Sequence, residues 1–326
     1  MNTRRKLLIA LGASALAPPL ASLAQQQPKI WRIGYLVASD DGDKNSRSFF
    51  AELASLGYVE GKNLIIESRS AGGKLERLPA LAAEIVATKP DLIFAPPAPA
   101  TAAVKALTAT IPIVFCFVNE PVALGFAQSL ARPGGNLTGM SNFSVEIAGK
   151  RIELLKEMVP RLNRLCAWYN PDAVNDAVEL REVEIAAARF GMQFLGVKAR
   201  NPTEYDEAAA ATRKWGADAT YINSNPAAFA NRKQIISLMS ALKMPAMYFI
   251  TPFVEDGGLI CYAANFPDLA RRAASFADKI LRGAKPGELP IEQPTKLELA
   301  INLKTAKALG IKIPNSIMLR ADKVIE

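Results

Sequence analysis

The sequence predicts an α/β protein with two doubly wound, Rossmann-like lobes, each a parallel sheet covered by helices on both faces. The chain of 326 residues is long enough for about two domains, and its 50% apolar content can fill two cores. Continuous apolar runs typical of buried strands alternate with amphipathic helical patterns, and this alternation restarts near the middle of the chain.

The first series of elements begins at Trp31. Apolar runs predict strands at about 31–37, 64–70, 91–95 and 111–118. Apolar residues at helical spacing predict intervening helices at about 46–56, 75–86, 100–108 and 122–131. Glycine and proline close several of these helices, as Gly57 and the pair Lys89-Pro90 do. Four strand–helix units of this kind predict one complete lobe.

The second series follows a bridging segment at about 136–144 and a helix through 152–158. It predicts strands at about 165–169, 192–199, 219–223 and 244–250, with helices at about 176–190, 205–215 and 228–242. A further strand at 258–264, a helix at about 268–281 and a final strand and helix form a tail. Because the tail returns after both lobes are built, we expect a multi-strand hinge. One lobe would hold residues 29–142 and about 264–295, the other about 143–263 and 296–326.

The N-terminus has the pattern of a cleaved export signal over residues 1–24. Arg4, Arg5 and Lys6 precede an apolar run, which ends in the small residues of Ser22-Leu23-Ala24. The cationic start suits twin-arginine export, with the general secretory route as the alternative. No cysteine precedes Cys116, so no lipid anchor can follow cleavage, and we expect a Gram-negative periplasm. Without the signal the net charge of +8 falls to +5 with no dense basic run, which argues against nucleic-acid binding.

The composition excludes several classes of enzyme and metal site. The chain has no histidine, which rules out Ser-His-Asp and Cys-His catalysis and histidine-ligated zinc. Its 3 cysteines lie in separate apolar runs and are expected to be buried thiols, with one disulfide as the alternative. Nucleotide-binding glycine motifs and the nucleophile-elbow motif are missing from the sequence. We therefore expect neither catalytic residues nor a cofactor or metal.

Several longer stretches carry a family resemblance. They are LGYVEGKNLIIESR (56–69), TIPIVF (110–115), SLARPGGNLTG (129–139), IEQPTK (291–296) and INLKTAKALGIKIPNSIMLRADKVIE (301–326). With them the chain resembles the substrate-binding proteins of ABC transporters annotated for tryptophan/tyrosine-type uptake, which have a type I periplasmic-binding fold. The resemblance implies a monomeric receptor, without catalysis, that passes a small solute to a membrane permease and its ATPase.

Some positions depart from the pattern that the resemblance implies. The loop after the third strand usually reads Gly-Thr-Pro, and here it is Pro97-Ala98-Pro99. Ala98 lacks the hydroxyl that would hold a ligand carboxylate, and prolines lack the N–H, so only Thr101 remains nearby. An aspartate after the 219–223 strand is replaced by Asn223-Ser224-Asn225, which removes a partner for an ammonium. We therefore expect a neutral or weakly charged small solute, aromatic in part, held by amides and hydroxyls over apolar walls.

Candidate ligand-binding residues follow from the fold, because open α/β sheets bind ligands beyond the carboxyl ends of their strands. The candidates are Ser39, Asp40, Ala98, Thr101, Asn119, Glu120, Asn142, Tyr169, Asn170, Asn223, Asn225, Phe249 and Tyr262. Alternatives stay open for them. Glu120 could instead be a charge at a helix start, Asn142 a hinge residue, the other asparagines turn formers, and the aromatic residues part of the core.

Two other functions fit the same sequence. The same fold could present a ligand to a membrane kinase or chemoreceptor, without a permease. An exported enzyme is the more remote alternative, because the usual catalytic constellations are missing.

Overall fold

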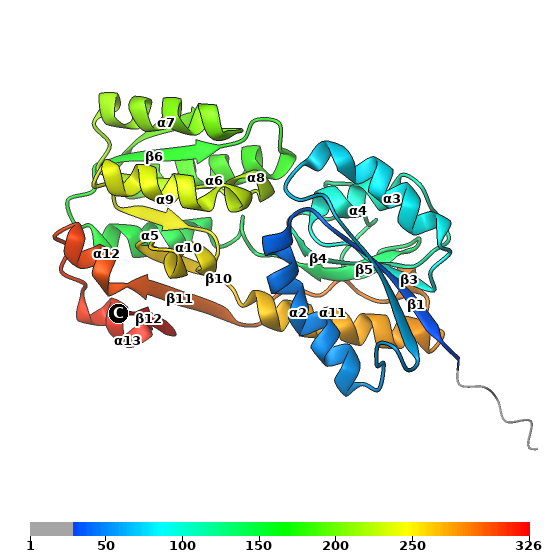
Figure 1. Ribbon diagram of the computed structural model, residues 1–326. Helices are drawn as coiled ribbons and strands as arrows, with labels where there is room; N and C mark the ends of the chain where they lie inside the picture. The colour runs from blue at the N-terminus through cyan, green and yellow to red at the C-terminus, as the bar shows by residue number, and fades with distance from the viewer. Residues whose placement is uncertain (1–28) are drawn as a thin grey trace, which may run out of the picture. The chain divides into compact units, whose positions relative to one another are not determined.

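The computed structural model describes residues 29–326, so the predicted signal segment lies outside the described residues. Residues Trp31–Glu326 form one compact unit with two sheets, each carrying its own helices (Figure 1). We call the five-stranded sheet and its helices lobe 1, and the seven-stranded sheet and its helices lobe 2. This is the two-lobe α/β fold that the sequence predicts.

The sheet of lobe 1 is entirely parallel, with strand order β2-β1-β3-β4-β5. Its strands are β1 (Trp31–Val37), β2 (Leu64–Ser70), β3 (Leu92–Phe94), β4 (Ile113–Val118) and β5 (Leu137–Ser141). Successive side chains of a strand point to opposite faces. Tyr35 and Phe94 accordingly enter the core under one face, whereas Leu36 and Ile93 enter the core under the other.

Helices cover both faces of this sheet. They are α2 (Asp40–Ser55), α3 (Leu78–Ala87), α4 (Ala98–Lys105) and α11 (Phe266–Leu281), with short 3₁₀ helices η1 (Leu75–Arg77) and η2 (Pro286–Glu288). Phe49 and Leu53 of α2 pack with Phe276 of α11 on the Tyr35 face. Ile85 of α3 and Val104 of α4 fill the other face. Helix α11 belongs to lobe 1 although it follows the strands of lobe 2 in sequence (Figure 1).

The sheet of lobe 2 has the order β12-β11-β10-β9-β8-β6-β7. Its strands are β6 (Arg164–Tyr169), β7 (Gln193–Lys198), β8 (Ala219–Ile222), β9 (Ala246–Tyr248), β10 (Ile260–Ala264), β11 (Leu297–Asn302) and β12 (Lys323–Ile325). The expectation of parallel strands fails at one place, because β11 pairs antiparallel with β10. Strand β10 runs out of lobe 2, whereas the chain re-enters along β11 after visiting lobe 1, so the two neighbours run in opposite directions.

Two further cores lie on the two faces of the lobe 2 sheet. The helices of this lobe are α5 (Ala148–Met158), α6 (Val174–Arg189), α7 (Pro202–Trp215), α8 (Pro226–Ala230), α9 (Arg232–Ala241), α10 (Thr251–Glu255), α12 (Leu303–Ala308) and α13 (Asn315–Arg320). Leu155 of α5 and Val183 of α6 pack beneath one face, and Tyr205 of α7 and Ile235 of α9 beneath the other.

The chain passes between the lobes along three segments, at 142–147, at Asn265 and at 293–296. The residue before the last of these, Glu292, is tied to lobe 1, because its carbonyl accepts the N–H of Ser141 at 2.8 Å. Several short connections of this kind form the hinge that the returning tail predicts.

Two helix predictions are wrong in detail. No helix forms over 122–131; one turn after Pro121 is followed by irregular chain. Glu120 at φ +49° and Gly125 at φ +68° hold left-handed conformations, which a continuous helix does not allow. The helix predicted at 228–242 is interrupted at Asn231, which separates α8 from α9.

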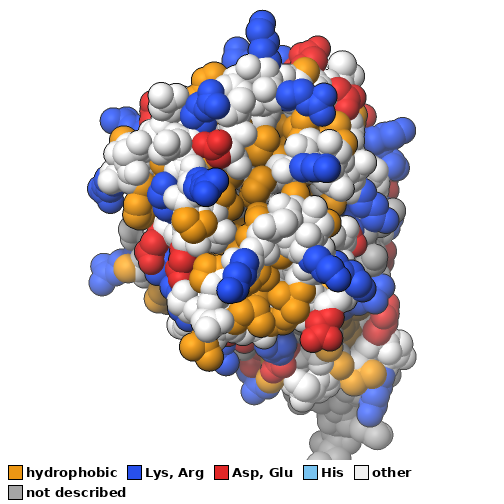
Figure 2. Space-filling model, turned by 90° about the vertical axis from the view of Figure 1, so that its left-hand side faces the viewer, with side chains coloured by type: hydrophobic (Ala, Val, Ile, Leu, Met, Phe, Trp, Pro, Cys, Tyr) orange, Lys and Arg blue, Asp and Glu red, His pale blue; other side chains and the backbone are white. Residues whose placement is uncertain are grey.

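All three cysteines are buried and free, as expected. Figure 2 views the molecule from the lobe 2 end, where Lys and Arg side chains are scattered among apolar and acidic ones rather than gathered in one stripe.

Candidate functional site

A cavity of about 550 Å³ lies between the two lobes. Most of its wall comes from loops and helix starts that follow a strand, or from the segments that connect the lobes. In lobe 1 these are the chain after β1, β2, β3 and β4, and in lobe 2 the chain after β6, β7, β8 and β9. The volume is in the range of roughly 300–1,000 Å³ that is usual for small-molecule sites.

The wall supplied by lobe 1 is mostly apolar. Pro96, Pro97, Ala98 and Pro99 form one side of it, with a cis peptide bond between Pro96 and Pro97. Because α4 begins with this segment, its first turn offers fewer free N–H groups than an ordinary helix start. Phe117 lies against Phe266 with ring centroids 4.5 Å apart and planes within 4°, and both side chains line the cavity. This wall can accommodate an apolar or aromatic group.

The wall supplied by lobe 2 is rich in amides. Asn175, Asn201, Ser224, Asn225 and Asn231 all line the cavity. Two of them also start helices: the side chain of Asn201 accepts a hydrogen bond from the N–H of Glu204 at 3.2 Å, and Asn225 accepts from Ala228 at 2.7 Å. Rigid helix caps therefore hold polar groups at this wall.

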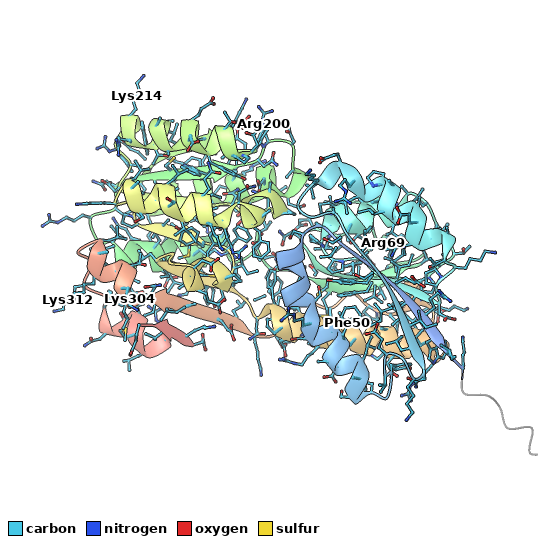
Figure 3. All side chains as sticks on the ribbon, in the orientation of Figure 1. Phe50, Arg69, Arg200, Lys214, Lys304 and Lys312 are labelled. Carbon is cyan, nitrogen blue, oxygen red and sulfur yellow. The ribbon has the colours of Figure 1, made fainter. Side chains whose placement is uncertain are left out.

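Arg200 and Asp172 are the charged residues in the cavity lining. The guanidinium of Arg200 lies 2.6 Å from Glu204 and 3.7 Å from Asp172, and its side chain is 44% exposed. Figure 3 places it at the start of α7, at the edge of lobe 2 next to lobe 1. The charge of Arg200 is thus paired within lobe 2, at the rim of the cavity.

Behind the lobe 2 wall lies a buried ionic network centred on Arg151. Its guanidinium is 2.9 Å from Glu179, and the two side chains are 1% and 0% exposed. Arg151 also donates to the hydroxyl of Tyr221 at 3.0 Å and to the carbonyl of Phe249, which lines the cavity, at 3.2 Å. Burial raises the pKa of Glu179, against the opposing effect of Arg151. Glu179 in turn accepts the N–H of Ser224 at 2.9 Å, so the network fixes the cavity wall from behind.

The same Arg151 reaches the segments that join the lobes. It donates to the hydroxyl of Ser144 at 3.0 Å, in the connection that follows β5, and to the carbonyl of Tyr262 at 2.7 Å, in the strand that leads back to lobe 1. One buried side chain therefore connects the cavity wall with the segment 142–147 and with the strand that leads to the connection at Asn265.

Asp176 follows the cavity-lining Asn175 in the first turn of α6, and its side chain is fully buried. One carboxylate oxygen accepts the N–H of Asn170 at 2.6 Å and the amide of Asn225 at 2.9 Å. The other oxygen has no partner. Burial, with a further contribution from the nearby Glu179, raises the pKa of Asp176 to about 8. The carboxyl group is therefore mostly protonated at neutral pH.

The structure places six of the predicted residues in the cavity lining: Ser39, Ala98, Asn119, Asn142, Asn225 and Phe249. The amide of Asn119 donates to the hydroxyl of Ser224 at 3.4 Å, which joins lobe 1 to lobe 2 at the cavity. Their contact with a ligand stays a prediction.

Six other predicted residues lie outside the lining: Thr101, Glu120, Tyr169, Asn170, Asn223 and Tyr262. The hydroxyl of Thr101 donates to the carbonyl of Ala95 at 2.6 Å. The side-chain amide of Asn223 donates to the main-chain carbonyl of Asp176 at 3.1 Å, so both side chains are engaged within the fold. Glu120 does not stand at a helix start, because the predicted helix does not form. The side chain of Asp40 lies outside the described residues.

Several residues that build the site were not predicted from the sequence. Arg200 and Asn201 follow β7, and the helix-start signal Asn201-Pro202 could have placed them at the cavity. The buried charges Arg151, Asp176 and Glu179 gave no signal, because charged residues on helices are usually exposed. In residues 29–326 no group of acidic or sulfur side chains could hold a metal ion, and no helix is long and apolar enough to cross a membrane.

Comparisons with known proteins agree with this architecture. A tyrosine-binding protein of Clostridioides difficile (strain R20291) is 26% identical over 281 residues, which cover 86% of this chain and 80% of that protein. A conserved domain protein from Vibrio cholerae superimposes with a TM-score of 0.86 at 26% identity, covering 91% of this chain and all of that one.

An ABC domain from Streptococcus pneumoniae in complex with L-Trp superimposes with a TM-score of 0.85 at 24% identity, covering 90% of this chain and 99% of that one. Two more distant structures share the fold alone, each with a TM-score of 0.60: a solute binding protein from Bacillus halodurans with bound myo-inositol, at 12% identity, and an arabinose binding protein from Geobacillus stearothermophilus, at 14% identity. The profile of one family, described as ABC transporter substrate binding protein, matches residues 33–325. With two lobes around one cavity and a match over nearly all of its described length, this chain belongs to the ABC transporter substrate-binding protein family.

Proposed function

We propose that this protein captures a small, partly aromatic organic solute in the periplasm and delivers it to the permease and ATPase of an uptake transporter. The observation that carries this proposal is the cavity of about 550 Å³, to which both lobes contribute. A ligand that touches both walls stabilises the arrangement in which the lobes are close together. The permease can then distinguish loaded from empty receptor by the position of the lobes.

The aromatic character of the solute follows from the lining. Phe117, Phe229, Phe249 and Phe266 offer ring surfaces from both lobes, while amides set the orientation of the ligand. The relatives named for tyrosine and found with L-Trp bind solutes of this size and kind, which supports the same class here. The predicted export signal of residues 1–24 supports a periplasmic location.

Native mass spectrometry of protein purified without refolding tests the proposal. We expect a non-covalently retained mass of a few hundred daltons or less, which is lost on unfolding. Small-angle scattering of the emptied protein should then show compaction when the solute is added back. A protein that retains nothing and gains no thermal stability from any member of a broad library of small aromatic solutes would contradict the proposal.

A matched pair of variants places the binding event in the cavity. Ala98→Trp fills the cavity from the lobe 1 side, and we expect it to abolish solute binding. Ala210→Trp adds the same side chain at an exposed position of α7 that does not line the cavity, and should bind normally. Equal binding by both variants would move the site elsewhere.

A further inference from the structure

The unpartnered polar atoms around the cavity are hydrogen-bond acceptors. Asn119 and Asn175 line the cavity, and each has a buried side-chain oxygen without a partner. Asp176 and Asn223, directly behind this wall, each have another unpartnered oxygen, and that of Asp176 becomes an acceptor when the carboxyl ionises. Among the described residues no buried side-chain nitrogen lacks a partner. Because unpaired buried acceptors cost free energy, a ligand that fills this end of the cavity gains most by donating hydrogen bonds.

The buried charges behind this wall are unbalanced. Glu179 is paired with Arg151, whereas Asp176 has no ion pair in the described part of the chain. Its hydrogen bonds come from neutral groups, the N–H of Asn170 and the amide of Asn225. A buried carboxyl without a cation stays protonated or waits for a positive charge from outside. Since Asn225 joins Asp176 to the cavity lining, a cation in the cavity would lie close to it.

The opposite wall disfavours a carboxylate. Pro97 and Pro99 have no N–H to donate, and Ala98 has no hydroxyl. The guanidinium of Arg200, at the rim, is already held by Glu204 and Asp172. The apolar segment 96–99 and the stacked pair Phe117 and Phe266 suit a ring instead.

We propose that the solute is an aromatic amine without a free carboxylate. Its ammonium donates to Asn119 and Asn175 with Asp176 as the counter-charge behind them, and its ring rests on the lobe 1 wall. This proposal rests on the receptor function proposed above and specifies its substrate class. It replaces the neutral solute expected from the sequence with a cationic one, because the buried Asp176 supplies the carboxylate that Asn223-Ser224-Asn225 lacks. The ammonium supplies the donors that Asn119 and Asn175 lack and the cation that Asp176 lacks.

Isothermal titration of the purified protein with three indole probes of equal chain length tests this class. Tryptamine has only the amine, L-tryptophan has amine and carboxylate, and indole-3-propionate has only the carboxylate. We expect tryptamine to bind at least tenfold more tightly than L-tryptophan, and indole-3-propionate not to bind. Tyramine, L-tyrosine and 3-(4-hydroxyphenyl)propionate should show the same order.

A substitution at Asp176 tests whether its charge, and not only its size and hydrogen bonds, contributes to binding. Asp176→Asn keeps the size and the hydrogen bonds of the buried group but cannot ionise, so we expect at least a tenfold loss of tryptamine affinity. Asp206→Asn removes a carboxylate at an exposed position of α7 that does not line the cavity, and should change the affinity less than threefold.

Proton release gives a readout that a purely structural role of Asp176 would not produce. Because Asp176 has a pKa of about 8, it is mostly protonated at pH 7, and a bound ammonium makes it ionise. Titrations in buffers of different ionisation heat should show close to one proton released per tryptamine bound, and almost none in Asp176→Asn.

The outcomes separate the substrate class from the receptor function. Tightest binding by an amino acid or by a carboxylate-only probe, or an Asp176→Asn variant that binds tryptamine normally, would overturn the amine. Binding of another solute with compaction would leave the receptor function standing while the amine proposal falls. If no probe binds and purification yields no retained solute, both fall.

Discussion

The two walls of the cavity are supported by different interactions. Behind the lobe 1 wall lies an apolar core in which Phe49, Leu53 and Phe94 pack against the sheet. Behind the lobe 2 wall lies the Arg151–Glu179 pair, fully enclosed and linked to cavity residues by hydrogen bonds. The stability that apolar packing contributes does not change with pH, whereas the stability of a buried ionic network depends on the presence and the charge of each partner. The difference predicts that the two lobes respond differently to mutation and to pH.

The largest effect should come from removing the centre of the network. Arg151→Met leaves the buried Glu179 without its cation and frees the Phe249 carbonyl, so we expect a loss of about 4 kcal/mol in the free energy of unfolding. Urea unfolding followed by circular dichroism measures it. Arg200→Gln, at the exposed rim, is the control and should cost no more than about 1 kcal/mol. Similar losses in both variants would show that the buried network contributes no more to stability than the exposed ion pair of Arg200.

Lobe 1 should lose stability by a different mechanism. Leu53→Ala opens a cavity beneath the sheet, because Leu53 is fully buried in α2, and we expect a loss of about 3 kcal/mol. The same urea experiment at several pH values should give a constant loss, since no titratable group is involved. A loss that varies strongly with pH would show that the two lobes are not as distinct as proposed.

The fold was predictable because its signal lies in short stretches of sequence. Strands such as β4 carry continuous apolar runs, and the restart of the pattern indicated two lobes. The direction of β11 was not predictable, because it depends on where the chain re-enters lobe 2. The helix predicted over 122–131 does not form because Gly125 adopts a left-handed conformation, and the apolar spacing of this segment gives no sign of that conformation.

The site was only partly predictable for a similar reason. The rule that ligands bind beyond the strand ends placed Asn119, Asn142 and Asn225 in the cavity lining. It could not reveal the groups behind the wall. Glu179 is buried because Arg151, 28 residues away on another helix, meets it in space, and single-sequence periodicity does not record such a pairing.

The buried carboxyl of Asp176 should give lobe 2 a pH dependence of its own. Between pH 4 and the raised pKa of about 8, the folded state keeps a proton that the unfolded state releases, so stability falls as pH rises through this window. Asp176→Asn cannot titrate and so lacks this pH dependence. The difference in the free energy of unfolding between the variant and the natural protein should therefore rise in favour of the variant by about 1 kcal/mol per pH unit between pH 5 and 7, below the limit of about 1.4 kcal/mol for one proton.

Urea unfolding of both proteins across that range measures the effect of Asp176. Glu179, whose pKa is also raised, contributes in the same direction and is present in both proteins, so the difference reports Asp176 together with its interaction with Glu179. A parallel pH dependence of the two proteins would show that Asp176 is already ionised in the folded state.

The smallest effect concerns the contact that joins the two walls. The amide of Asn119 in lobe 1 donates to the hydroxyl of Ser224 in lobe 2 at 3.4 Å, close to the limit for a hydrogen bond. A double-mutant cycle with Asn119→Ala and Ser224→Ala should give a coupling of about 0.5 kcal/mol in the free energy of unfolding. In the presence of a bound solute the coupling should shrink, because the ligand takes over the polar groups that the two residues otherwise offer each other. A coupling above about 2 kcal/mol would instead mean that this contact itself holds the lobes together, and that the walls are less independent than their separate cores indicate.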